Sequence, residues 1–159
     1  MKTSLIPIFA LFFMGLNPVA APAQDTPETA ATAMWEQDRT QVFDASGINL
    51  NDFVWLARPV VVFADTPNDP QFKHQMDLLT ARIEALADRD VIVITDTDPA
   101  ARSDIRQKLR PRGFMLVLVD KDGRVALRKP APWDVRELSR SIDSSPLRQQ
   151  EIADRRISQ

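Results

Sequence analysis

Two short apolar runs, each followed by the same start signal for a helix, constrain the fold of this chain most. Residues 59–64 (PVVVFA) and 91–94 (VIVI) are rich in β-branched side chains and show no polar alternation, which is typical of strands buried on both faces. The pairs Asp69-Pro70 and Asp98-Pro99 follow these runs. An aspartate N-cap with proline at the first helical position marks a helix start, so the sequence predicts two successive strand-to-helix units.

The segments after the two Asp-Pro pairs have helical periodicity. Apolar residues spaced by four and three predict one long helix with a single apolar stripe, formed by Phe72, Met76, Leu79, Ile83 and Leu86. Residues 101–109 predict a shorter helix. Because a helical crossover returns the chain to the same end of the sheet, we expect the first two strands to be parallel.

A hairpin and further helices complete the expected fold. Residues 114–119 and 124–128 predict two antiparallel strands joined by the tight turn DKDG at residues 120–123. Helices are expected over residues 135–142 and 146–152. The order βαβαββα predicts an α/β, thioredoxin-like fold with a four-stranded mixed central sheet and flanking helices. The alternative, a flavodoxin-like sheet, needs more parallel strands and lacks the closing hairpin.

The first 23 of the 159 residues have the features of an export signal. Lys2 precedes an apolar core at residues 5–16 that is too short to span a bilayer, and Ala21-Pro22-Ala23 is a small-residue cleavage site. A retained membrane anchor is the alternative, and the short core disfavours it. We therefore expect a signal peptide at 1–23, a disordered tether and N-terminal extension at 24–51, a domain at 52–159, and a periplasmic or secreted location.

Four motifs spread over residues 52–152 resemble a domain of unknown function in exported proteobacterial proteins. A similar domain, described as peroxiredoxin-like, occurs in vertebrate sushi-repeat and related matrix proteins. The motifs are Phe53-x-Trp55-x-x-Arg58-Pro59, Arg89-Asp90, Lys121-Asp122-Gly123 and Ile142-Asp143-x-x-Pro146-x-Arg148-x-x-Glu151. The resemblance implies a thioredoxin-like fold and an extracytoplasmic setting, and it implies no established activity.

Composition excludes the usual chemistry of such a fold. A thioredoxin-like chain carries its reactive thiol at the start of the helix after the first central strand, where the helix dipole stabilises a thiolate. Here residues 63–70 (FADTPNDP) occupy that place, and the chain has no cysteine. Cysteine-dependent redox activity is therefore excluded. The net charge of −2, with both signs interleaved, also gives no footprint for nucleic acid, and no motif implies a cofactor.

Oxygen-bearing side chains follow both central strands. The ends of parallel strands meet at one edge of the sheet, so we expect the two loops to be neighbours and to form a candidate ligand-binding site of Asp65, Thr66, Asn68, Asp69, Asp96 and Asp98. The aspartates could instead gather Mg²⁺ or Ca²⁺. However, Asp69 and Asp98 already serve as expected N-caps, and no motif of fixed ligand spacing supports a metal.

Other notable residues are expected to be structural. His74, the only histidine, lies one to two helical turns from Thr66, and a solvent-facing position is favoured over a role as a general base. Trp55 and Trp133 are expected to close the edges of the core. Pro111 precedes the third strand and is expected to be trans.

Charged residues at the strand ends are likewise expected to be structural. Arg58, Arg89 and Arg112 are expected to pair with nearby carboxylates, and the run from residue 148 to 156 is expected to be a solvated helix face. No catalytic residue is assigned.

Two functions from different classes remain open. The favoured hypothesis is a non-redox binding or interaction module that recognises an unidentified protein or small molecule in the envelope. The alternative is an enzyme or metal-binding protein that uses the Asp and Thr loops. The missing thiol and the absence of an acid–base pair favour the first hypothesis.

Overall fold

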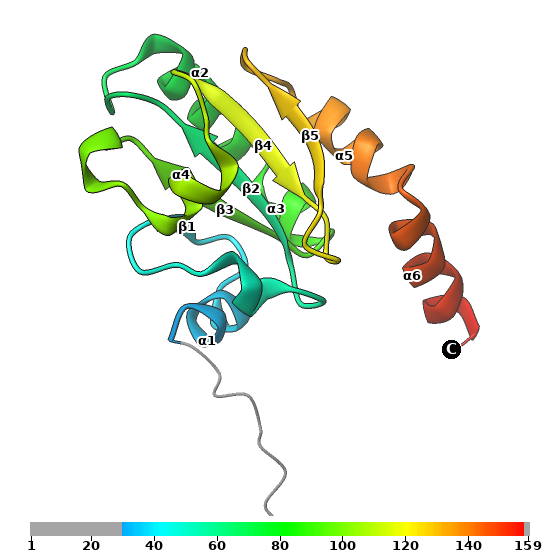
Figure 1. The fold of residues 1–159 in the computed structure, drawn as a ribbon. Coiled ribbons are helices and arrows are strands. Elements are labelled where there is room, and N and C mark those ends of the chain that lie inside the picture. Colours follow the sequence, from blue (N-terminus) through cyan, green and yellow to red (C-terminus); the bar gives the residue numbers. More distant parts are fainter. Residues whose placement is uncertain (1–29, 158–159) are drawn as a thin grey trace, which may run out of the picture.

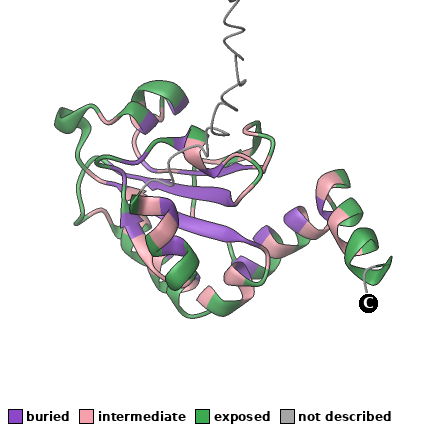
Figure 2. Cartoon of the chain, turned by 90° about the horizontal axis from the view of Figure 1, so that it is seen from below, coloured by how far each residue is buried: buried purple, intermediate pink, exposed green. Residues whose placement is uncertain are grey.

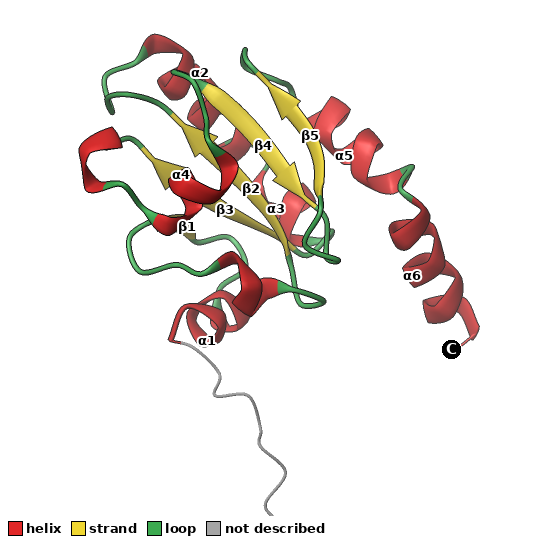
Figure 3. Ribbon diagram, in the orientation of Figure 1, coloured by secondary structure: helices red, strands yellow, loops and turns green. Residues whose placement is uncertain are grey.

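The two predicted strand-to-helix units form the centre of the fold. A computed structural model describes residues 30–157, and Figure 1 shows one sheet with helices on both sides. The helices and strands, coloured by type in Figure 3, are α1 (Ala30–Gln37), β1 (Val42–Asp44), η1 (Leu50–Phe53), β2 (Arg58–Phe63), α2 (Pro70–Thr80), α3 (Ile83–Ala87), β3 (Val91–Asp96), η2 (Pro99–Ala101), α4 (Asp104–Leu109), β4 (Met115–Val119), β5 (Val125–Lys129), α5 (Val135–Asp143) and α6 (Pro146–Ile157).

The sheet has the order β1-β3-β2-β4-β5. Strands β2 and β3 are parallel and pair along their whole length, from Arg58 opposite Val91 to Phe63 opposite Asp96. Strands β2 and β4 are antiparallel, as are β4 and β5. The α/β class, the central parallel pair and the closing hairpin predicted from the sequence are therefore confirmed.

The sheet has five strands where four were predicted. The additional strand is β1, which pairs in parallel with β3 from Val42 opposite Val93 to Asp44 opposite Thr95. It is three residues long and lies at the edge of the sheet. A strand this short gives too few residues for an alternating pattern to be recognised, which is why sequence analysis missed it.

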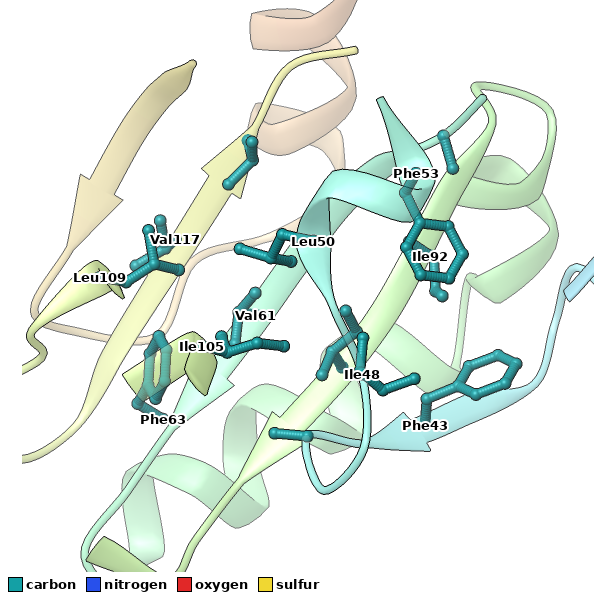
Figure 4. Packing of buried hydrophobic residues seen from close by; sticks show 14 of the residues in the cluster. Phe43, Ile48, Leu50, Phe53, Val61, Phe63, Ile92, Ile105, Leu109 and Val117 are labelled. Carbon is teal, nitrogen blue, oxygen red and sulfur yellow. The ribbon is translucent and has the colours of Figure 1, made fainter. Parts of the chain in front are cut away.

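Each face of the sheet has its own hydrophobic core. Alternate residues of β2 point to opposite faces: Val61 and Phe63 join one cluster, and Val60 and Val62 the other. Figure 4 shows the first cluster, in which residues of η1 and α4 cover the sheet. Residues of α2, α3 and α5 cover the opposite face. In Figure 2 the central strands are buried along almost their whole length, whereas the helices combine buried, intermediate and exposed residues.

The predicted long helix is two helices. Its stripe is interrupted between α2 and α3, where Arg82 leaves the helical conformation with φ −140° and ψ 33°. The Thr80 hydroxyl donates to the carbonyl oxygens of Met76 and Asp77, a back-bond that competes with the helical ladder. The five stripe residues, on both sides of the break, all pack in the second hydrophobic core.

The ordered body begins earlier than residue 52. Residues 30–33 were expected in the tether, yet they form the first half of α1. Trp35 on α1 is fully buried and its indole Nε1 donates to the Val91 carbonyl at 3.3 Å. The packed body thus extends N-terminal of residue 52 as far as α1. The expected signal peptide and residues 24–29 lie outside the described residues.

Several local expectations can be checked directly. Gly123 has φ +81°, as the tight turn requires, and no peptide bond from residue 30 to 157 is cis, so Pro111 is trans. Trp133 is half-buried against the second core. Trp55, in contrast, is 67% exposed, and its expected role in closing the core is wrong. Within residues 30–157 no helix is both long enough and apolar enough to span a membrane.

Candidate functional site

The loops that follow β2 and β3 are neighbours, as predicted. Phe63 pairs with Asp96 at the end of the two strands, and the amide of Ala64 donates to the Asp96 carbonyl oxygen at 3.0 Å. The side chains of both loops therefore start from one rigid edge of the sheet.

Arg106 on α4 closes the junction between these strand ends. Its Nε and Nη2 donate to Asp96 Oδ1 at 2.9 and 2.7 Å. The same Nη2 donates to the carbonyl oxygens of Ala64 and Asp96 at 2.8 and 2.9 Å. The guanidinium also lies 5.4 Å from the ring centre of Phe63. The side chain is 12% exposed, so one largely buried cation donates to the Asp96 carboxylate, to the Ala64 carbonyl and to the Asp96 carbonyl, which also accepts from the Ala64 amide.

Asp96 is fully engaged in this junction. Its side chain is 4% exposed, and its second oxygen accepts a hydrogen bond from the Ser103 hydroxyl. The same hydroxyl caps α4 by accepting from the amide of Arg106. A carboxylate held by two partners in this way is positioned to fix α4 against the sheet.

Asp65 is the accessible carboxylate of the junction. Its side chain is 64% exposed, and Oδ1 lies 3.9 Å from Arg106 Nη1. Gly113, in the loop before β4, has φ +59°, and a Cβ at that position would lie 4.0 Å from Asp65 Oδ2. The loop before β4 thus borders the site, although sequence analysis did not assign it there.

Thr66, Asn68 and Asp69 form a hydrogen-bonded turn at the surface. The Thr66 hydroxyl accepts from the amide of Asn68 at 3.3 Å, and the Thr66 carbonyl accepts from the amide of Asp69. Asp69 caps α2 through the amides of Gln71 and Phe72, which confirms its predicted role. We call residues 65–69 the strand-end loop. It is rigid at both ends and open to solvent between them.

Asp98 lies on the other side of the junction. It caps η2 through the amides of Ala100 and Ala101, as predicted. It also lines a small cavity of ≈ 60 Å³ together with Asp44 and Asp96. Hydrogen bonds from the side chain and amide of Ser46 lower the pKa of Asp44. Even so, no group of three or more acidic or histidine side chains within residues 30–157 is arranged to hold a metal ion.

The site has no nucleophile activated by a base. The Thr66 hydroxyl has a hydrogen bond to the Asn68 amide only, and no described carboxylate or imidazole accepts its proton. His74 is exposed on α2 and forms no hydrogen bond with Thr66. The arrangement can present oxygen acceptors to a partner, but a hydroxyl without an adjacent base remains a poor nucleophile.

A second charged cluster lies at the opposite end of the central strands. We call it the basal ion network, and Arg58, 1% exposed, is its centre. Arg58 Nε donates to Asp120 Oδ1 at 2.9 Å, and Nη2 donates to Glu151 Oε1 at 2.8 Å. Lys121 Nζ bridges Asp90 and Glu151 at 2.8 and 3.3 Å. This network joins β2, the β4–β5 turn and α6.

Helix α6 belongs to this network. Glu151 accepts from Arg58 and Arg148, and Arg148 is buried, so the expectation of a wholly solvated C-terminal helix face is wrong. Burial alone would raise the pKa of Glu151, but the hydrogen bonds from Arg58 and Arg148 and the charges of Arg58 and Lys121 outweigh it and lower the pKa to about 2.

Of the three arginines expected to pair with carboxylates, two do so. Arg58 pairs as above, and Arg89 makes a two-pronged contact with Asp143 at 2.9 and 2.7 Å. Arg112 is exposed and forms no ion pair with any residue of the described part. Arg106, which holds the strand-end junction, was missed altogether. Its only sequence signal is a position three residues after the Ser103 cap, and many surface arginines share that.

The sequence profile of one protein family, described as "Domain of unknown function (DUF4174)", matches residues 49–151. The chain belongs to this family. No curated protein matches it. The four motifs singled out in the sequence lie within this DUF4174 domain. Four of their charged residues, Arg58, Asp90, Lys121 and Glu151, belong to the basal ion network, and Arg148 joins the Arg89–Asp143 pair to it. Asp122 lies outside the network and pairs with the exposed Arg124.

Solved structures similar to the DUF4174 chain have thioredoxin-like folds. A reduced 2-Cys peroxiredoxin from Plasmodium vivax is 15% identical, with a TM-score of 0.53 over 65% of this chain and 85% of that one. Chloroplastic thioredoxin z is 21% identical, with a TM-score of 0.50 over 66% and 96%. At this identity the similarity establishes the fold alone.

The strand-end loop and the charged residues of the family motifs therefore lie at opposite ends of the central strands. The strand-end loop lies where a thioredoxin-like chain places its thiol, and it holds oxygen acceptors in its place. The basal ion network, which contains Arg58, Asp90, Lys121 and Glu151 of the motifs, lies at the other end of β2 and β3 and anchors α6.

Proposed function

We propose that this chain is an exported, non-redox binding module of thioredoxin-like fold that recognises a partner of the cell envelope through the strand-end loop. The observation that carries the proposal is the Arg106 junction. Arg106 pairs with the Asp96 carboxylate and donates to the carbonyls of Ala64 and Asp96. The charged groups in the rigid part of the site are therefore already paired. What remains open to solvent is the turn of residues 65–69 and its exposed Asp65 carboxylate.

The chemistry of the loop supports recognition in preference to catalysis. Asp96 is held by Arg106 and Ser103 and its side chain is only 4% exposed, so a substrate cannot reach its carboxylate. Thr66 lacks a base. The exposed oxygens of Asp65 and Thr66 are acceptors on a preorganised turn, which lowers the ordering cost of binding. Asn68 Oδ1 accepts from Lys73 Nζ at 3.1 Å and so helps to hold this turn. The Asp65 and Thr66 oxygens suit a partner that presents hydrogen-bond donors or a positive charge.

A site-specific crosslinker tests the proposal. Chains with a photo-activated benzophenone side chain at position 68, in the loop, or at position 150, an exposed position on α6, are expressed with the native N-terminus and irradiated in the host envelope. We expect one discrete adduct from position 68, absent from position 150 and lost when Asp65→Ala is added. Equal adducts from both positions, or an adduct insensitive to Asp65→Ala, contradict the proposal.

A melting experiment with divalent cations tests the alternative, a metal-binding protein. If Mg²⁺ or Ca²⁺ raises the melting temperature of the purified chain by several degrees and Asp65→Ala abolishes the rise, the strand-end loop binds a metal and the interaction hypothesis loses its support. We expect no such rise, because Asp69 and Asp98 are committed to N-caps.

Export has its own test. N-terminal sequencing of the chain recovered from the host periplasm is expected to begin at Gln24, after the small-residue site. A chain that keeps Met1, or that stays in the cytoplasm, contradicts the export part of the proposal.

A further inference from the structure

A groove lies between the α2–α3 junction and α5, at the far end of α2 from the strand-end loop. Its volume is ≈ 600 Å³. Ala81, Ala85 and Val135 supply an apolar floor, and the rest of the lining is charged or polar. Because α2 separates this groove from the strand-end loop, binding at one can be measured without the other.

Four arginines line the groove against two carboxylates. The arginines are Arg82, Arg89, Arg136 and Arg140, and the carboxylates are Glu84 and Asp143. The whole chain has a net charge of −2, so this local excess of positive charge runs against the average of the molecule.

Two of the four arginines form ion pairs with carboxylates, and the other two do not. Arg89 is held by Asp143, and its Nη1 donates to the Ala85 carbonyl at 2.7 Å. Arg140 pairs with Glu137. Arg82 and Arg136 are exposed and form no ion pair with any residue between 30 and 157.

Arg89 is preorganised to assist them. Its guanidinium is fixed by two acceptors, and its side chain is half-buried. Nη1 and Nη2 each use one of their two hydrogens in the bonds to Ala85 and Asp143, so one N–H on each remains for a ligand. A guanidinium fixed in this way donates to an oxyanion with little loss of side-chain entropy.

We propose that this groove binds a small organic anion through an oxyanion group, a carboxylate or a phosphate. Arg82 holds the oxyanion from the α2–α3 junction and Arg136 from α5, and Arg89 donates to it as well. The Ser139 hydroxyl adds a neutral donor, and Ala81, Ala85 and Val135 pack against the carbon skeleton of the ligand. Arginine forks match the planar carboxylate and the tetrahedral phosphate.

The test uses inorganic phosphate and succinate as separate probes at constant ionic strength. Amide chemical shifts of the ¹⁵N-labelled chain are followed during each titration. We expect saturable shifts confined to residues 81–89 and 135–143. Saturation by phosphate identifies a phosphate ligand, and saturation by succinate identifies a carboxylate ligand.

Matched variants make the test specific. Arg82→Gln and Arg136→Gln are each expected to weaken binding about tenfold, the loss of one charge-assisted contact. Arg112→Gln removes the same charge from an exposed, unpaired arginine outside the groove and is expected to change affinity less than twofold. Arg82 and Arg136 are both exposed, so the two variants are expected to keep the wild-type spectrum outside the groove.

Three outcomes overturn the proposal. Neither probe saturates, the shifts lie outside the groove, or Arg112→Gln weakens binding as much as Arg82→Gln. Binding to phosphatidylglycerol vesicles without binding of either soluble probe also overturns it, because that result assigns the charge to a membrane surface.

Discussion

The Arg106 guanidinium closes the junction between the carboxyl ends of β2 and β3. It is one of the few cations of this chain placed almost wholly inside the protein, and its donors reach the carbonyls of Ala64 and Asp96 as well as the Asp96 carboxylate. Lysine cannot reproduce this contact, because an ammonium lacks the planar fork that spans separated acceptors.

We therefore expect Arg106→Lys to lower the free energy of unfolding by about 2–3 kcal/mol, since it leaves buried acceptors unpaired. Urea denaturation followed by circular dichroism measures the change. Arg110→Lys is the control: Arg110 is exposed and next to the same helix, so it is expected to shift stability by about 0.5 kcal/mol or less. Equal effects of the two substitutions contradict the role of Arg106.

Trp55 is strained and exposed at once. Its φ is +65°, a conformation unfavourable for a bulky L-residue, and its amide donates to the Lys121 carbonyl at 2.7 Å. We expect Trp55→Gly to be more stable than Trp55→Ala by about 1 kcal/mol, because glycine tolerates positive φ and alanine does not.

Thermal unfolding of the three proteins, wild type and both variants, measures this difference. If alanine is as stable as glycine at position 55, the backbone is not strained there. If both variants lose more than about 2 kcal/mol, the ring makes a stabilising contact after all.

Among the elements, α6 is attached to the body mainly by charge. Its buried residue is Arg148, and Glu151 joins it to Arg58 and Lys121. An ion pair in a partly buried setting is screened by salt less than a surface pair, but it still depends on the ionisation of Glu151.

The pKa of Glu151 is lowered to about 2 in the folded chain, from an ordinary value of 4.5. A depressed pKa means that the carboxylate stabilises the fold above pH 4.5 and that this contribution is lost as pH falls from about 4.5 to about 2. We expect Glu151→Gln to lose about 2 kcal/mol of stability at pH 7, and the difference from wild type to shrink over that pH window.

Urea denaturation of wild type and variant between pH 7 and pH 2.5 measures the effect. Glu137→Gln is the control, because its pair with Arg140 is exposed and is expected to contribute about 0.5 kcal/mol or less. A difference between Glu151→Gln and wild type that stays constant with pH contradicts the assignment.

The elements that sequence analysis located were those with a strong local signal. Strands β2 and β3 are continuous β-branched runs, and Asp69 and Asp98 are N-caps that are each followed by proline at the start of the helix. The elements it missed depend on tertiary contacts. Strand β1, for example, exists because β3 offers an edge.

At the scale of the whole molecule, the fold was predictable and the site was predictable only in part. The topology placed the loops after β2 and β3 together, and the structure confirms this. It did not reveal that Arg106 would fill the junction, because the long-range meeting of α4 with Asp96 leaves no periodicity in the sequence. The convergence of motif residues on the basal ion network was invisible for the same reason.

The extent of the folded unit is also a property of the whole molecule. The family match begins at residue 49, and sequence analysis placed the boundary at 52. Yet α1 buries Trp35 completely, and Arg39 Nη1 lies 2.6 Å from the Asp90 carboxylate. Both contacts attach the N-terminal segment to β3 or to the residue before it, so the segment belongs to the core.

Two truncations test this boundary. A chain that starts at residue 30 keeps every described contact, and we expect its stability to match that of the mature chain. A chain that starts at residue 42 loses Trp35, and loss of a buried tryptophan alone costs about 3–5 kcal/mol. Urea denaturation is the measurement, with the point variant Trp35→Ala as a check that the loss follows from that side chain. If the chain that starts at residue 42 is as stable as the one that starts at 30, the fold begins where the family match does and α1 is dispensable.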